Sequence, residues 1–358
     1  MKDRIINIIS IFIICVLIWS LVPISYSARP DSANKNNAMG LYAEKENSLD
    51  MVYIGGSSCY VYWEPLRAWN EYGFTSYNFS HDTMAPQTIE HYIKETLKYQ
   101  KPDLFVVDIK PFEYAENIYK EEKILHGEVP IRNSTDTIKY SLNRFNLINA
   151  GVEKFSERPS YYFDFIKYHN NYLFSTYYRY HVLNNVSFTN EKENAYKGFD
   201  FIERQEDVTL NDNSNVIEES KISNEVNDIL ISLLRYCQDE ELNVLFVVCP
   251  YVETSKEKKT YNYLERIVKE YGFDFIDAND HYDELKFDEK LDFYNTSHVN
   301  IFGADKYTDY LGNYIISNYS FSEKEIDKEK WNELYSDFNE ISNEYKKRIK
   351  ESTPESKD

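Results

Sequence analysis

The sequence predicts an α/β fold built on a doubly wound, mainly parallel sheet. From residue 49 onward, short apolar runs alternate with amphipathic stretches in the order strand, helix, strand, helix, strand. The run Leu104–Ile109 is apolar on both faces, as is typical of a central parallel strand. The connections between these elements are short, which implies right-handed crossovers.

Three strands and two helices make up the first part of the expected domain. In the first helix, Leu66, Trp69 and Tyr72 recur at a spacing of three, and Gly73 follows as a C-cap. The second helix begins at Pro86, a residue that suits a first helical turn. We expect strands at residues 49–54, 75–79 and 104–109, and helices at residues 65–72 and 86–99.

An insertion at about residues 112–215 interrupts this alternation. Its segment 161–180 contains seven tyrosines and three phenylalanines, which combine apolar area with polar tips. Two interpretations remain open: a helical insertion packed on the sheet, or an aromatic platform for a substrate. Residues 207–220 are mostly polar and predict a loop.

The sheet then resumes and ends in two helices. Asn300 is a suitable N-cap for the last helix of the α/β domain, which begins near Ile301. Beyond Ser322, spaced aromatic and aliphatic residues predict an amphipathic helix and a frayed end. The remaining expected elements are helices at 222–239 and 256–271 and strands at 243–249 and 273–277.

The N-terminal apolar run, Ile5–Ile24, is long enough to span a bilayer as a helix. Lys2 and Arg4 precede it, which predicts that the following domain is extracytoplasmic. A signal peptide cleaved after Ser27 is the alternative, but the run exceeds a usual signal core. We therefore expect an anchor or signal at 1–28, a linker at 29–48, the α/β domain at 49–320 and a charged helix and tail at 321–358.

Composition excludes several classes of function. The 358-residue chain has a formal net charge of −20, which makes nucleic acid an unsuitable partner. It contains no P-loop, GxGxxG, CxxC or HExxH motif, so neither a nucleotide site nor a zinc site is indicated. No cofactor or metal is therefore expected.

The first strand ends in the turn Gly55-Gly-Ser-Ser58, the first of two stretches that suggest chemistry. Glycines allow a tight turn and a close backbone approach, and in an α/β fold such a turn presents Ser57 at the edge where ligands bind. An ordinary strand-to-helix turn explains the same residues. The second stretch contains His298, just before the last helix of the domain, at a place where it can meet Ser57 and act as its base.

Gly55-Gly-Ser57 together with Asn295-Thr-Ser-His298 resembles the SGNH/GDSL hydrolase superfamily. The stretch from Phe293 to Lys306 is similar to membrane-anchored members related to the D-alanine transfer protein and to alginate-type O-acetyltransferases. The resemblance implies a flavodoxin-like sheet. It also implies serine-dependent acyl transfer or ester hydrolysis on an extracytoplasmic polysaccharide or teichoic acid, beside a membrane-bound O-acyltransferase.

The resemblance assigns roles to individual residues. Ser57 matches the nucleophile, with Ser58 as the alternative if the motif slips by one, and His298 matches the base. Asn295 stands where the family has an aspartate, and Asp292 is the alternative group to orient the histidine. A neutral amide stabilises imidazolium less than a carboxylate does. This departure motivates a second hypothesis, a non-catalytic polymer-binding or scaffolding partner of the acyltransferase.

The groups that would stabilise an oxyanion are also expectations. The Ser57 backbone N–H is one candidate donor, and the Asn78 side-chain amide, at the end of the second strand, is another. Lys110 follows the third strand, where it can meet an oxyanion or an anionic substrate. It can equally form a salt bridge with Asp108 or Glu113.

Overall fold

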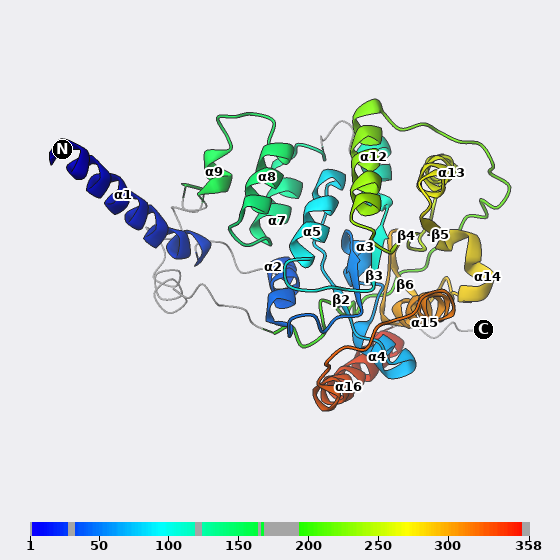
Figure 1. Ribbon diagram of the computed structural model, residues 1–358. Helices are drawn as coiled ribbons and strands as arrows, with labels where there is room; N and C mark the ends of the chain where they lie inside the picture. Colours follow the sequence, from blue (N-terminus) through cyan, green and yellow to red (C-terminus); the bar gives the residue numbers. More distant parts are fainter. Residues whose placement is uncertain (1, 28–32, 119–123, 164–165, 168–192, 353–358) are drawn as a thin grey trace.

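The protein contains a five-stranded parallel sheet, with the strand order β2-β1-β3-β4-β5 (Figure 1). The computed structural model describes residues 2–27, 33–118, 124–163, 166–167 and 193–352. The strands are β1 (Met51–Ile54), β2 (Ser76–Asn78), β3 (Leu104–Asp108), β4 (Val244–Val248) and β5 (Asp274–Asp277). This strand order is that of a doubly wound sheet, so the α/β class predicted from the sequence is confirmed.

Helices flank the sheet on both faces (Figure 1). One face carries α5 (Ile89–Thr96), which follows the 3-10 turn η2 (Pro86–Thr88), together with α12 (Asn224–Asp239) and α13 (Ser255–Glu270). The other face carries α4 (Pro65–Tyr72), α15 (Ile301–Asn318) and α16 (Lys328–Ser352), and these three helices contact one another. Every residue of the strands β1 to β4 is buried, as expected for strands covered on both sides.

Local sequence signals fix several of these boundaries. Gly73 has a φ of 78° and ends α4 with a left-handed cap, as predicted. Asn300 caps α15, because its Oδ1 accepts a hydrogen bond of 3.0 Å from the Phe302 backbone N–H. Helix α13 begins with a capping box formed by Thr254 and Glu257, which the sequence analysis did not identify.

The segment predicted as a linker is instead part of the folded domain. Residues 33–43 form α2 (Ala33–Met39) and the 3-10 helix η1 (Gly40–Ala43). Leu41 is fully buried in the main core, and the Tyr77 hydroxyl donates a hydrogen bond of 2.6 Å to the Asn37 carbonyl. The boundary at residue 49 was therefore wrong, because this polar-looking stretch contributes its few apolar side chains to the core.

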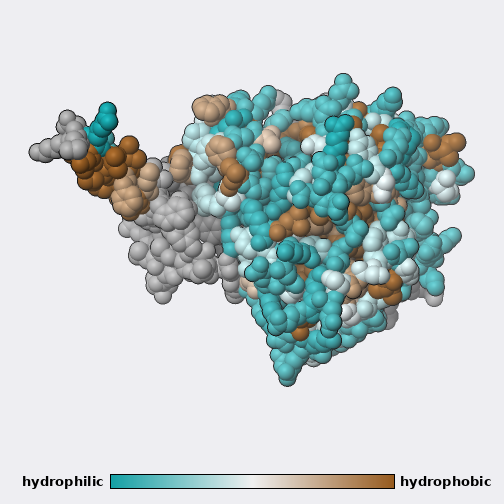
Figure 2. All heavy atoms as spheres, in the orientation of Figure 1, coloured by the Kyte–Doolittle hydropathy of each residue, from teal (hydrophilic) through white to brown (hydrophobic). Residues whose placement is uncertain are grey.

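The N-terminal segment forms α1 (Lys2–Ser27). Its described side chains, residues 4–17, are exposed and mostly apolar, and appear as brown atoms at the upper left of Figure 2. Among the residues that the structure describes, no helix is both long and apolar enough to cross a membrane. The structure thus gives no support to the predicted transmembrane helix.

The insertion is largely helical up to residue 163. Its first part turns through α6 (Lys110–Glu113) and the π-helix η3 (Tyr114–Ile118). Residues 124–163 of the described chain form three further helices: α7 (Glu128–Asp136), α8 (Leu142–Gly151), which contacts α5, and α9 (Pro159–Tyr162). Most of the tyrosine-rich segment, residues 164–165 and 168–180, lies outside the described residues, so its role as a substrate platform stays a prediction. Residues 207–220 form no helix or strand, in agreement with the predicted loop.

A short antiparallel hairpin follows the last strand of the sheet. After η4 (Ala278–His281) and α14 (Tyr282–Leu285), the chain forms β6 (Phe293–Asn295) and β7 (His298–Val299). The sequence did not predict strands here. A single residue separates the hairpin from α15, and the hairpin carries His298, the predicted base.

Candidate functional site

The candidate site lies where the carboxyl ends of β1 and β3 meet, at the point where the strand order reverses. Gly55 and Gly56 link β1 to the short helix α3 (Ser57–Tyr60), so that Ser57 is the first residue after the turn. A Cβ on Gly55 would lie 2.6 Å from the Asp108 Cβ, so only glycine fits there. The close approach of the turn to β3 explains this glycine.

The structure brings Ser57 and His298 together although 241 positions separate them. The Ser57 Oγ lies 2.7 Å from the His298 Nε2, within hydrogen-bond distance. Ser57 and His298 are both half-buried, and the contact joins the turn after β1 to the β6–β7 hairpin. This is the geometry expected of a nucleophile and its base.

Asn295 lies on the other side of the imidazole. Its Oδ1 is 3.1 Å from the His298 Nδ1 and also accepts a 2.8 Å hydrogen bond from the Ser297 backbone N–H. An atom that accepts from a backbone N–H is the amide oxygen, so the facing Nδ1 carries the imidazole proton. The Nε2 is then free of a proton and accepts from the Ser57 hydroxyl. Asn295 thus holds the histidine in the tautomer that a general base requires.

Asp292, the alternative orienting group, faces a different partner. Its Oδ2 accepts hydrogen bonds of 2.6 Å from the Lys306 ammonium and 2.6 Å from the Asp288 backbone N–H. Its carbonyl accepts the Asn300 backbone N–H at 2.9 Å. Asp292 therefore ties the hairpin to α15, and it is Asn295 that meets the imidazole.

Burial sets the charge state of His298. Removal from solvent lowers its pKa, and the nearby positive charge of Lys110 lowers it further, to about 3. The imidazole is therefore neutral at physiological pH and available to accept a proton. The same low pKa makes it a weak base, because nothing at Asn295 supplies the negative charge that would stabilise imidazolium.

Ser58, the alternative nucleophile, points to a buried carboxylate that the sequence analysis did not assign to the site. The Ser58 Oγ donates a 2.5 Å hydrogen bond to the Asp108 Oδ2, and the Lys110 backbone N–H donates a 3.0 Å hydrogen bond to the Oδ1. Burial raises the pKa of Asp108, while the hydrogen bonds from Ser58 and from the backbone of Lys110 and Gly56 oppose that rise. The sequence did contain a signal for Asp108, because an aspartate stands at the end of an otherwise apolar strand.

Lys110 is almost fully buried beside the site, with 2% of its surface exposed. Its ammonium lies 3.5 Å from the centre of the Tyr251 ring and 5.1 Å from that of Tyr114. Burial alone would lower the pKa of Lys110, but Tyr114 and Asp108 outweigh it and leave the pKa raised. Lys110 thus carries a positive charge that acts electrostatically on His298, and its ammonium lies against aromatic rings.

Asn78 does not serve as the predicted oxyanion donor in this structure. Its side chain is fully buried, and its Nδ2 donates a 2.8 Å hydrogen bond to the Trp63 carbonyl. The amide therefore holds the segment between α3 and α4. The Ser57 backbone N–H stays a predicted oxyanion donor.

Two contacts anchor the β6–β7 hairpin to the segment that follows β4. The Tyr62 hydroxyl donates to the Pro250 carbonyl at 2.8 Å and lies 3.1 Å from the Ser297 carbonyl. The Val252 backbone N–H donates to the Thr296 carbonyl at 2.9 Å. These contacts fix where the hairpin presents His298.

Comparisons with known proteins do not place the chain in a family: no family model and no curated protein matches it. Among the described residues, no group of three or more histidine, cysteine, aspartate or glutamate side chains has the geometry of a metal site.

Proposed function

We propose that the protein is a serine-dependent acyl-transfer enzyme of the SGNH/GDSL type. The observation that carries the proposal is the 2.7 Å contact between the Ser57 Oγ and the His298 Nε2, with Asn295 fixing the tautomer. The doubly wound strand order and the position of Ser57 directly after β1 support the same family.

The reaction follows from this geometry. The Ser57 oxygen attacks the carbonyl of an acyl ester while its proton passes to the His298 Nε2. The same proton then passes to the departing alcohol, and the acyl group stays on Ser57 as an ester. An acceptor hydroxyl, or water, gives its proton to His298 and takes the acyl group, which restores the serine.

The proposed substrate is an O-acetyl or D-alanyl ester, and the acceptor is a hydroxyl of a cell-envelope polysaccharide or teichoic acid. In this proposal a membrane-bound O-acyltransferase supplies the acyl group on the extracytoplasmic side of the membrane. The exposed apolar side chains of residues 4–17 support attachment of the protein to that membrane.

The acyl-enzyme tests the proposal directly. Full-length protein is treated with p-nitrophenyl acetate and analysed by intact mass and peptide mapping. We expect an acetyl adduct on Ser57 that is absent from Ser57→Ala and retained in Ser214→Ala, which removes an exposed serine hydroxyl elsewhere. Folded protein that acquires no adduct on Ser57 would overturn the proposal.

A second candidate function is a non-catalytic partner that binds the polymer for a membrane acyltransferase. The observation that favours it is the neutral Asn295 in place of a carboxylate, together with the low pKa of His298. Polymer binding by a folded protein that forms no acyl adduct would support this second function.

A further inference from the structure

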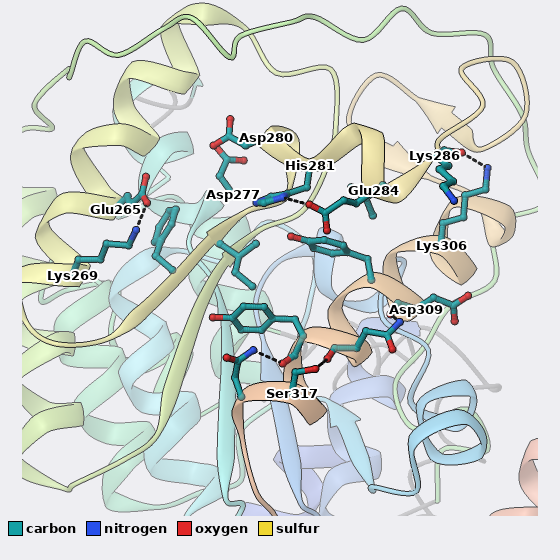
Figure 3. Close-up of a pocket in the computed structure, with 17 residues that line it drawn as sticks. Glu265, Lys269, Asp277, Asp280, His281, Glu284, Lys286, Lys306, Asp309 and Ser317 are labelled. Atoms are coloured by element: carbon teal, nitrogen blue, oxygen red, sulfur yellow. Dashed lines mark hydrogen bonds and ion pairs between the residues drawn. The ribbon is translucent and has the colours of Figure 1, made fainter.

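A groove of about 810 Å³ runs along α15 on the outer side of β5, between α13 and α14 (Figure 3). We call it the α15 groove. Its size is within the range of sites that hold organic ligands. Neither Ser57 nor His298 lines it, so it is separate from the catalytic site.

Two tyrosines one helical turn apart form part of its wall. Tyr310 and Tyr314 are separated by four residues on α15 and therefore lie on the same face of the helix. Both are half-buried, and the Tyr310 ring packs against that of His281 with 5.4 Å between the centroids. Half-buried aromatic rings with polar tips offer flat apolar faces beside hydrogen-bonding groups, as the faces and hydroxyls of a sugar require.

The charged side chains of the groove favour a neutral ligand, because most of them are already paired within the protein. Four of its five carboxylates pair with cations: Asp277 and Asp280 with Lys258, Asp309 with Arg67, and Glu265 with Lys269. Of its three lysines, Lys269 is in that set and Lys306 pairs with Asp292 at 2.6 Å. Carboxylates and side-chain amides such as that of Asn313 accept or donate hydrogen bonds to hydroxyls, whereas a phosphate or uronate chain would find little unpaired positive charge.

Hydrogen bonds link one end of the α15 groove to the β6–β7 hairpin. Lys306 lines the groove and donates to the Asp292 carboxylate, and the Asp292 carbonyl accepts the backbone N–H of Asn300, two residues after His298. A polymer bound along α15 would therefore extend toward the N-terminal end of the helix, which His298 precedes.

We propose that the α15 groove binds a segment of an uncharged hexose polymer, which is the acceptor of the acyl group. The inference rests on the proposed function and narrows its acceptor to a neutral polysaccharide. Tyr310 and Tyr314 stack against successive sugar faces, and the carboxylate of Glu284 accepts hydrogen bonds from sugar hydroxyls. A peptide added as a strand to the open edge of β5 is the competing occupant.

Calorimetric titration of the full-length protein tests the groove with three probes of different charge. These are the hexamers of N-acetylglucosamine (neutral), glucosamine (cationic) and galacturonic acid (anionic). We expect the neutral hexamer to bind and the anionic hexamer to fail. Tyr310→Ala and Tyr314→Ala should each weaken binding about tenfold, by loss of ring contact.

Three further variants separate recognition from folding. Tyr310→Phe keeps the ring and should retain affinity, while Tyr236→Ala removes a half-buried tyrosine on α12 and should leave binding unchanged. Glu284→Gln removes the charge of an exposed side chain without a core role and should weaken binding. If none of the hexamers binds, or if the ring variants bind as well as the native protein, the proposal is overturned. Failure of all three hexamers would leave the peptide as the remaining occupant to test.

Turnover of p-nitrophenyl acetate, measured on the same variants, distinguishes this proposal from the proposed function. The small ester needs only the catalytic site, so Tyr310→Ala should hydrolyse it at the native rate. Ester turnover without hexamer binding overturns the groove alone. Hexamer binding without acylation of Ser57 supports the groove as a glycan site and overturns its place in acyl transfer.

Discussion

Asp108 accepts a hydrogen bond from Ser58, the neighbour of the proposed nucleophile, across two adjacent strands of the sheet. The carboxylate lies at the end of β3, and the turn it holds lies at the end of β1. The two adjacent serines thus have different partners: Ser58 is bound to Asp108, and Ser57 is left to face His298.

Replacement of Asp108 tests this arrangement. Asp108→Ala leaves the buried Ser58 hydroxyl and the Lys110 N–H without their acceptor, so we expect a loss of about 2 kcal/mol in the free energy of unfolding. Urea unfolding measures it, with the exposed Asp283→Ala as the control. A loss no larger than that of the control would show that Asp108 does not hold the turn.

Asn295→Asp should increase acyl transfer. A carboxylate at this position keeps the acceptor for the Nδ1 proton and adds the negative charge that stabilises imidazolium. We expect the p-nitrophenyl acetate turnover to rise at least about tenfold at neutral pH, with the increase in kcat. Asn295→Ala is the matched variant and should lower it. Equal rates in all three proteins would mean that Asn295 does not orient the base.

The low pKa of His298 predicts an unusual dependence of activity on pH. Because the imidazole remains neutral down to about pH 3, ester turnover should not fall as the pH drops from 8 through 6.5, where an ordinary histidine would lose activity. Lys110→Met removes the nearby positive charge, so the acid limb should move to higher pH, while Lys110→Arg should keep the native profile. An acid limb near 6.5 in the native protein would contradict the assignment.

Stability should depend on the same group. In the unfolded chain His298 binds a proton below about pH 6.5, whereas in the folded protein it does so only below about pH 3. The unfolded state therefore binds more protons than the folded state in this interval. The contribution of His298 to stability falls as the pH drops through the interval. The His298→Asn variant should lose less stability than the native protein between pH 7 and pH 4, as measured by chemical unfolding at each pH. Parallel losses in the two proteins would argue against the shift.

Asp292 should matter for the fold of the hairpin rather than for the base. It accepts from Lys306 and from the backbone N–H of Asp288. Asp292→Ala removes both bonds and leaves the lysine only the Lys286 carbonyl, so it should reduce stability by about 2 kcal/mol. Under conditions in which the Asp292→Ala protein remains folded, the acid limb of its pH–rate profile should lie at the same pH as in the native protein. A shift of that limb would show that the carboxylate acts on His298 after all.

The sequence determined the elements that depend on local pattern. Alternating apolar runs indicated the order of strands and helices, and Gly73 and Asn300 marked helix ends that the structure confirms. The glycine–serine turn and His298 were found because each stands at the end of a recognisable element. Their meeting was predictable, because the turn after a parallel strand and the start of the last helix of an α/β domain both lie at the carboxyl edge of the sheet.

Tertiary structure decided what depends on long-range neighbours. Asp108 and Ser58 lie 50 residues apart, and no periodicity connects them. Leu41 is drawn into the core from a stretch whose polar composition predicted a linker, because burial depends on what packs against a residue. The choice between Asn295 and Asp292 was open in the sequence. Lys306, on α15, takes the aspartate, and this ion pair leaves the amide to orient His298.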